Sequence, residues 1–300
     1  MRPDAAREAV IVLVSSGFAA FGCSTPVVDL ADANGGVTQG LVLVERSGVA
    51  GAAPQTNVSA KFMRLPAASD ADLAERVVGS PFDRPSVGAC LQLGGAVEEP
   101  ISSLSGTGPI ELLDVGDVTV RAGESPMPLA ARAFPDVGDL VFGVFYTSRD
   151  AASELPAPAR YAFDSSGSTL LDRFSFDAEA PAGPEDVRIG DFDLADEPLI
   201  EEGAGAEVTW RAFDHAAEVD RVYIDVIASS GAAVRCGFRD TGHALIPASV
   251  MKEQSRGEGT TAVTIAVRRV REMPFAVSGV DLGEIRFDFS VIGRARLVSR

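Results

Sequence analysis

The sequence predicts a mainly β protein in which two β-sandwich-like domains follow a signal segment and a flexible tether. Short apolar runs with period-two alternation recur after residue 40, as expected for half-buried strands. The 30 glycines and 18 prolines supply the turns that a β-rich chain needs. The alternation breaks at EAPAGPEDV, which predicts a linker over 179–187 between a β-rich domain at 41–178 and a β-sandwich at 188–300.

The composition is that of a folded protein with an acidic surface. Hydrophobic residues make up 46% of the chain and charged residues 23%. A net charge of -17 repels nucleic acid and anionic lipid, so we predict no nucleic-acid partner. Such acidity is typical of a solvated exterior or of a calcium-binding surface, and composition leaves both readings open.

The amino terminus has the layout of a secretory signal. Arg2 and Arg7 precede the apolar stretch AVIVLVSSGFAAFG, which covers the 14 residues 9–22. This stretch is shorter than the roughly 17–25 residues of a membrane-spanning helix. We therefore predict a cleaved signal peptide over 1–22.

The residues Ala20-Phe21-Gly22-Cys23 resemble the lipobox of bacterial lipoproteins, in which a small residue precedes an obligatory cysteine. The resemblance implies cleavage before Cys23, attachment of acyl chains such as palmitate to that residue, and retention on a membrane. By the sorting habit of the family, Ser24 implies the outer membrane of the cell envelope, with exposure to the periplasm or the cell surface. Two alternatives stay open: Cys23 begins a conventionally secreted protein, or it is a buried thiol of a cytosolic one.

Residues 23–40 are predicted to form the lipidated cysteine and a tether. They contain Pro, an Asn-Gly-Gly sequence and small residues, without helical periodicity. Such a segment is suited to lift a domain off a membrane surface.

The domain predicted at 41–178 consists of short strands with one helix. The predicted strands or hairpins are LVLVER (41–46), NVSAKFMRL (57–65), ACLQLGG (89–95), PIELLDVGDVTVRAG (109–123), PLAARAF (128–134), LVFGVFYTS (140–148), ARYAFD (159–164) and DRFSFDA (172–178). The helix is expected to begin after Asp70 and to end at Gly79, with Leu73 and Val77 on one face.

The domain predicted at 188–300 is a sandwich of six or seven strands. Its predicted strands are VRIGDFDL (187–194), AEVTWRAF (206–213), DRVYIDVIAS (220–229), AAVRCGFRD (232–240), TAVTIAVRRV (261–270) and GEIRFDFSVIGRARLV (283–298). IPASVMKEQ (246–254) is expected to supply one helical turn. We expect Trp210 in the core rather than on a ligand-stacking surface.

Two further resemblances concern fold and location. AEVTW (206–210) and RVYIDV (221–226) resemble the early strands of fibronectin type III and other immunoglobulin-like sandwiches. LDVGDVTV (113–120) and CGFRDTGHALIPASVM (236–251) resemble segments of uncharacterised predicted lipoproteins from myxobacteria-like species. That group brings no activity to this chain.

Lipidation of Cys23 would leave Cys90 and Cys236 as an even pair in an oxidising compartment. If they pair, they join the two predicted domains and stabilise the folded state by about 5 kcal/mol in the chain-entropy treatment. Two buried thiols are the alternative, because sequence does not show whether the strands approach each other.

The sequence predicts no catalytic residue and no cofactor other than, as one option, calcium. His215 and His243 lack a partner at metal-ligand spacing, and neither a GxSxG turn nor a phosphate-binding loop occurs. The candidate for calcium is an acidic run that could equally lie on the wet face of an edge strand. Its members are Asp191, Asp193, Asp196 and Glu197.

The functional hypothesis is a non-catalytic binding or structural module of the cell envelope. Its lipid anchor would contact the membrane, and its partner would be a protein or a polysaccharide. The alternative is an envelope hydrolase or carbohydrate-active enzyme whose carboxylates, such as Asp191 or Asp240, assemble only in the fold.

Overall fold

The structure is a computed structural model that describes most of the chain after residue 35. It describes residues 36–66, 71–78, 82–94, 109–124, 126–134, 140–148, 155–213, 219–255 and 259–298. The predicted signal peptide, Cys23, the tether up to residue 35 and His215 lie outside the described residues.

The prediction of a mainly β protein is confirmed, because strands make up most of the described residues. The strands are β1 (Val37–Val49), β2 (Gln55–Leu65), β3 (Cys90–Leu93), β4 (Ile110–Leu112), β5 (Val118–Ala122), β6 (Pro126–Ala133), β7 (Val141–Thr147), β8 (Ala159–Ser165), β9 (Phe174–Ala180), β10 (Arg188–Ile189), β11 (Phe192–Asp193), β12 (Leu199–Glu201), β13 (Ala206–Thr209), β14 (Arg221–Ala228), β15 (Ala233–Arg239), β16 (His243–Ile246), β17 (Thr260–Val277) and β18 (Val280–Val298). Each predicted strand overlaps one of these, while β12 and β16 were not predicted.

The helices are short. They are α1 (Ala71–Val77), α2 (Ala248–Gln254) and the 3-10 turn η2 (Leu194–Asp196). Both α-helices lie where the sequence predicts them, although Asp70 and Gly79, the expected ends of the first, lie outside the described residues. Within the described part of the chain, no helix has the length and apolarity required to cross a membrane.

The strands form one large mixed sheet and one small sheet. The large sheet has 14 strands, in the order β3-β15-β14-β17-β18-β1-β2-β4-β7-β6-β5-β8-β9, with β12 paired to β18 beside this path. The small sheet has the order β11-β10-β13-β16. Strand β1 runs parallel to β18, although the two are the first and the last strands of the described chain.

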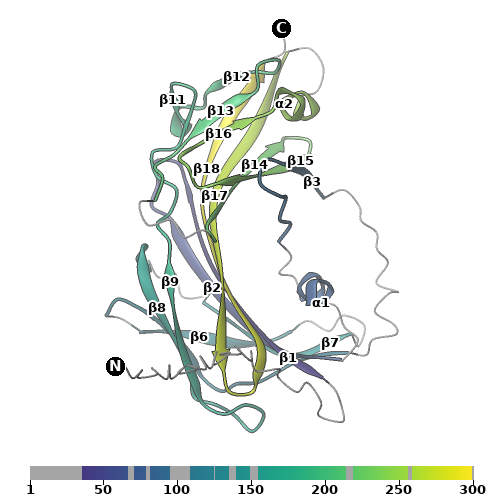
Figure 1. Ribbon diagram of the computed structural model, residues 1–300, viewed down its shortest axis with the longest axis vertical. Helices are drawn as coiled ribbons and strands as arrows, with labels where there is room; N and C mark the ends of the chain where they lie inside the picture. The colour runs from purple at the N-terminus through teal and green to yellow at the C-terminus, as the bar shows by residue number, and fades with distance from the viewer. Residues whose placement is uncertain are drawn as a thin grey trace, which may run out of the picture.

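The hairpin of β17 and β18 runs almost the full length of the molecule (Figure 1). Its tip contains Gly279, whose φ of +80° is accessible to glycine at little cost. The predicted strand ended at Val270, whereas β17 continues through Pro274 to Val277. Beyond Val270, β18 is the ladder partner of β17 among the described strands, so the missing N–H of Pro274 can face an unpaired edge.

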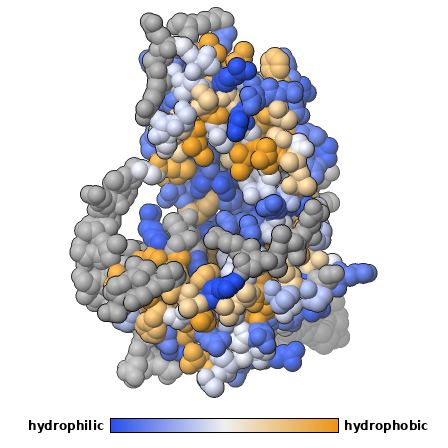
Figure 2. Space-filling model, turned by 180° about the vertical axis from the view of Figure 1, so that it is seen from behind, coloured by the Kyte–Doolittle hydropathy of each residue, from blue (hydrophilic) through white to orange (hydrophobic). Residues whose placement is uncertain are grey.

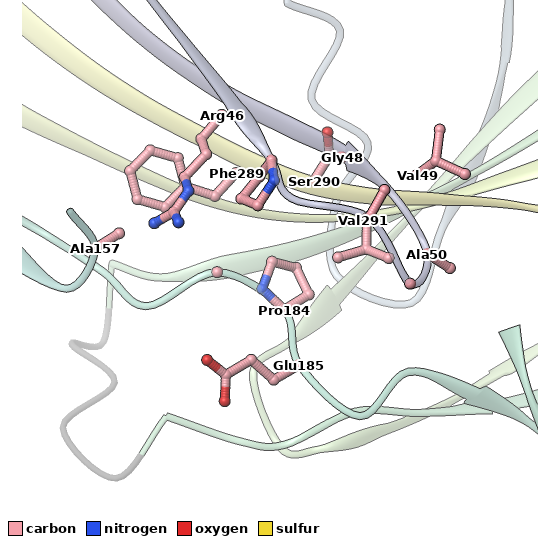
Figure 3. Close-up of a pocket in the computed structure, with 14 residues that line it drawn as sticks. Arg46, Gly48, Val49, Ala50, Ala157, Pro184, Glu185, Phe289, Ser290 and Val291 are labelled. Carbon is pink, nitrogen blue, oxygen red and sulfur yellow. The ribbon is translucent and has the colours of Figure 1, made fainter. Parts of the chain in front are cut away.

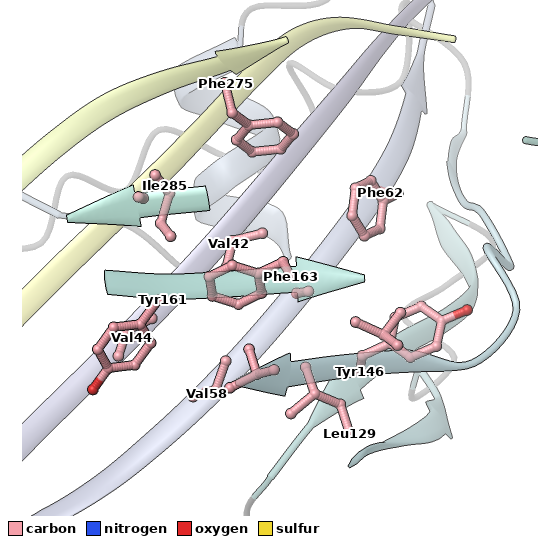
Figure 4. Packing of buried hydrophobic residues seen from close by; sticks show 14 of the residues in the cluster. Val42, Val44, Val58, Phe62, Leu129, Tyr146, Tyr161, Phe163, Phe275 and Ile285 are labelled. Atoms are coloured by element: carbon pink, nitrogen blue, oxygen red, sulfur yellow. The ribbon is translucent and has the colours of Figure 1, made fainter. Parts of the chain in front are cut away.

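Three groups of buried side chains fill the fold. The first core lies between β1, β2, β17 and β18 on one side and β5, β6, β8 and β9 on the other, and it includes Phe163 and Ile285 (Figure 4). The second core lies between the small sheet and β14, β15, β17 and β18, and includes Trp210 as expected. The third lies beneath α1 and includes Met63.

The predicted linker runs beside β17 and is held by two buried arginines. The Nη1 atom of Arg269 donates hydrogen bonds to the carbonyl oxygens of Ala182 (2.9 Å) and Gly183 (2.8 Å). The Nη1 atom of Arg271 donates to the carbonyl oxygen of Glu179 (3.0 Å). The division into two domains stays a prediction, since the β17–β18 hairpin supplies side chains to both the first and the second core.

The surface reflects the mixed composition. Figure 2 shows hydrophilic and hydrophobic residues interspersed over the face that it displays. This arrangement is ordinary for a folded chain, because polar groups are too few to cover a whole surface.

Candidate functional site

Cys90 and Cys236 form a disulfide in the structure. The two residues lie opposite each other in the antiparallel pair of β3 and β15, with an S–S distance of 2.05 Å. Cys236 is fully buried in the second core. The bridge fastens the segment 82–94 to β15 and joins positions 146 residues apart in the sequence.

A chain of buried ion pairs lies on the face of β14, β15 and β17 that points away from the second core. Asp225 accepts hydrogen bonds from Nε of Arg235 (2.7 Å) and Nε of Arg268 (2.9 Å). Arg268 also donates to Asp288 (2.7 Å). The ring of Phe82 covers the guanidinium of Arg235, with 4.3 Å between Cζ and the ring centroid. Because each charge has an opposite partner, this chain has the character of a structural network.

The acidic run proposed for calcium is spread around the η2 turn. Asp191 lies in the turn before β11, and Asp193 accepts a hydrogen bond from the backbone N–H of Ala195 (2.9 Å) and so caps η2. Asp196 belongs to η2, and Glu197 ends it in the left-handed region with φ 50°. No group of three or more His, Cys, Asp or Glu side chains among the described residues could hold a metal ion. The structure therefore does not gather these carboxylates into a cation site.

The carboxylate of Asp240, named in the enzyme alternative, is engaged inside the protein. Its Oδ1 accepts a hydrogen bond from Nε1 of Trp210 (2.6 Å) and its Oδ2 one from Nε of Arg269 (2.8 Å). The side chain is 2% exposed, so it lies away from solvent. His243 begins β16, where it is exposed.

A pocket of about 260 Å³ lies where the two cores meet (Figure 3). Its walls come from the β1–β2 connection, from β18 and from the predicted linker. The lining residues are Arg46, Gly48, Val49, Ala50, Gly51, Ala52, Pro54, Ala157, Gly183, Pro184, Glu185, Phe289, Ser290 and Val291. Most of these are small or apolar, which is typical of ligand pockets, and the junction of two cores is a frequent place for them.

The pocket has one cationic side chain in its lining, that of Arg46. Arg46 lies beside Phe289 in the β1–β18 ladder and continues the inward-facing row of Val42 and Val44. It is half-buried, and it forms no hydrogen bond or ion pair with any residue in the described ranges. Burial raises the pKa of Tyr161 to about 12, and the positive charge of Arg46 opposes that rise.

The carboxylate of the pocket is already paired. Arg211 contacts both Glu185 and Asp186 through its two terminal nitrogens. Glu185 is exposed and is already paired with Arg211. Arg46 is therefore the charged side chain of the lining that has no counterion among the described residues. Figure 3 shows that Arg46 and Glu185 enter from two different elements, β1 and the predicted linker.

Sequence reasoning did not identify this pocket. Arg46 ends a predicted strand and Glu185 lies in the predicted linker, and neither position carries a motif. The available signal was an arginine at an inward position of the alternating run LVLVER. That signal has meaning only once β18 is known to lie beside β1.

Comparisons with known proteins do not identify the chain. No protein-family model matches it, and no curated protein matches it. Among solved structures, the Fcho1 Mu homology domain of Danio rerio with a bound Eps15 peptide aligns over 88% of this chain and 97% of that chain, with 10% identity and a TM-score of 0.26. At this TM-score the likeness supports no conclusion about fold or function.

Proposed function

We propose that the protein is a non-catalytic binding module of the cell envelope, held on the outer membrane through Cys23, and that it binds a small ligand in the pocket at Arg46. In this proposal the chain has two sandwich-like units that share the β17–β18 hairpin. The pocket forms where the units meet.

The pocket is the observation that carries the binding role. It combines apolar walls with a single unpaired cation, an arrangement that favours oriented binding of one small molecule. Its lining, as far as the structure describes it, contains no His, Cys, Lys or Asp side chain. Ser290 and Glu185 belong to the lining, and the carboxylate of Glu185 is paired with Arg211.

The envelope location rests on other support. The disulfide between Cys90 and Cys236 is consistent with an extracytoplasmic protein, because such bridges form in oxidising compartments. The lipobox-like sequence before Cys23 supports a lipid anchor, because several acyl chains hold a protein on a membrane where one would not.

A variant that fills the pocket tests the binding role. Gly183 belongs to the pocket lining, and a Cβ atom built there meets nothing within 4 Å, so Gly183→Leu should add a bulky side chain at the pocket wall without a backbone clash. Gly203→Leu, at an equally open glycine outside the pocket lining, is the matched control. Protein purified natively from cell envelopes would be denatured, and the released small molecules compared by mass spectrometry.

We expect a compound that is released from the wild type and from Gly203→Leu but is missing from Gly183→Leu. Equal release from all three proteins, or release from none, would contradict a ligand in this pocket. The anchor has a separate test, in which Cys23→Ala should lose both acyl labelling and retention in the membrane fraction. Retention of Cys23→Ala in that fraction would contradict anchoring through Cys23.

A further inference from the structure

We propose that the ligand of the Arg46 pocket is a small carboxylate with a compact apolar body, bound with its anionic end at the guanidinium. This inference rests on the pocket of the proposed function and assigns the chemical class of its ligand. It follows from the position of Arg46, from the nature of the walls and from the size of the pocket.

The position of Arg46 favours an anion. A half-buried guanidinium without a counterion is unfavourable in a partly apolar surrounding, and an anion would offset that cost. Directly opposite Arg46 in the β1–β2 ladder lies Thr56, which is 3% exposed. Its hydroxyl has no hydrogen-bond partner among the described residues. Two neighbouring polar groups on one face of the sheet thus lack partners at this point.

The single positive charge favours a carboxylate over a phosphate. A planar guanidinium can donate two parallel hydrogen bonds to a carboxylate, which matches one charge with one charge. A phosphate dianion would require further cationic or N–H donors, and Arg46 is the one cationic side chain of the described lining.

The walls and the volume favour a compact apolar body. Phe289 belongs to the first core, while Ala50 and Val291 pack against the second, so an apolar group in the pocket would contact both cores. A volume of about 260 Å³ corresponds to roughly nine water molecules at about 30 Å³ each. It is slightly below the roughly 300–1,000 Å³ of pockets for larger ligands. A single ring or a short branched chain is the expected size.

Calorimetric titration with benzoate, benzamide, benzylamine and phenyl phosphate tests the proposal on the full folded chain. We expect benzoate to bind the wild type at least about tenfold more tightly than benzamide, and benzylamine not to bind. Arg46→Met, which keeps the apolar stem, should weaken benzoate by about tenfold or more. Arg173→Met removes an exposed arginine outside the lining and should leave the affinity unchanged. Gly183→Leu should abolish binding.

The outcomes separate this proposal from the proposed function. Equal affinity for benzoate and benzamide, or an unchanged affinity in Arg46→Met, would overturn the carboxylate while leaving a pocket that binds ligands. Tighter binding of phenyl phosphate would replace the carboxylate by a phosphate. If none of the four compounds binds, this ligand class is wrong, whereas the mass-spectrometric comparison of natural ligands would still decide the binding role independently.

Discussion

Arg269 and Asp240 form a fully buried ion pair on the inner face of β17, with 2.8 Å between Nε and Oδ2 and side chains that are 1% and 2% exposed. Arg269 also binds two carbonyl oxygens of the predicted linker, and Asp240 also binds the indole of Trp210. One ion pair therefore connects the long hairpin, the linker and the second core.

Arg269→Met should destabilise the protein by about 3–5 kcal/mol, because it leaves the buried carboxylate of Asp240 without its cation. Urea unfolding can be followed by the fluorescence of Trp210, the single tryptophan of the chain. Adding Asp240→Asn should restore part of the loss, since no uncompensated charge then remains. Arg121→Met, which breaks an exposed pair with Asp164, should cost only about 0–1 kcal/mol. Equal losses from Arg269→Met and Arg121→Met would contradict this account.

Cys90→Ala should lower the free energy of unfolding by about 2–5 kcal/mol, because the disulfide restricts a long loop of the unfolded chain. The same loss should follow when the wild type is unfolded in the presence of a reductant, and the reductant should not affect Cys90→Ala. Thiol labelling of the unfolded, unreduced protein without Cys23 should find no free cysteine. Two labelled thiols per chain would show that the bridge does not form.

Glu284→Gln should become more stable relative to the wild type as the pH rises. Burial, followed by the neighbouring carboxylates of Glu272 and Glu75, raises the pKa of Glu284 above its usual value of 4.5. The folded wild type therefore holds a proton that the unfolded chain releases at lower pH, so wild-type stability falls as the pH increases through this interval. Urea unfolding from about pH 4 to pH 8 measures the difference, and a difference independent of pH would be evidence against the effect.

Gly143→Ala should destabilise the protein by more than about 1–3 kcal/mol. Gly143 has φ +113°, and an added Cβ would lie 1.9 Å from the carbonyl oxygen of Leu112 in the adjacent strand β4. Gly203→Ala, where no atom lies near the added Cβ, should leave stability unchanged or slightly raised. Thermal unfolding of both variants checks this, and similar midpoints for the two would rule out a close backbone approach at Gly143.

The sequence predicted what depends on local periodicity. The alternating runs gave the strands, and ASVMKEQ gave the short helix α2. It could not predict which strands pair, because β1 and β18 meet across almost the whole chain and their register appears in no local pattern. For the same reason the arginine at the inward position of LVLVER could not be assigned to a pocket, since the neighbour of Arg46, Phe289, is 243 positions further along.

The acidic run shows the opposite case, in which a local pattern suggested a site that the fold does not build. Alternation placed Asp191 and Asp193 on one side of an extended segment. The chain instead turns at Asp191, and Asp193 uses its carboxylate to cap η2. The carboxylate of Asp193 is thus engaged by a backbone N–H close to it in the sequence, and it does not join the neighbouring carboxylates around a cation.

Strand β1 also separates the pocket from the point where the described chain enters the fold. The described chain enters the fold at Val37, next to the tip of the β17–β18 hairpin, where the backbone N–H of Thr38 donates to Asp281. Nine residues further along the same strand, Arg46 reaches the pocket, which at about 3.3 Å per residue corresponds to roughly 30 Å. In a protein anchored at Cys23, β1 would keep the pocket at a fixed distance from the residue at which the chain enters the fold. That distance would not depend on the conformation of the predicted tether.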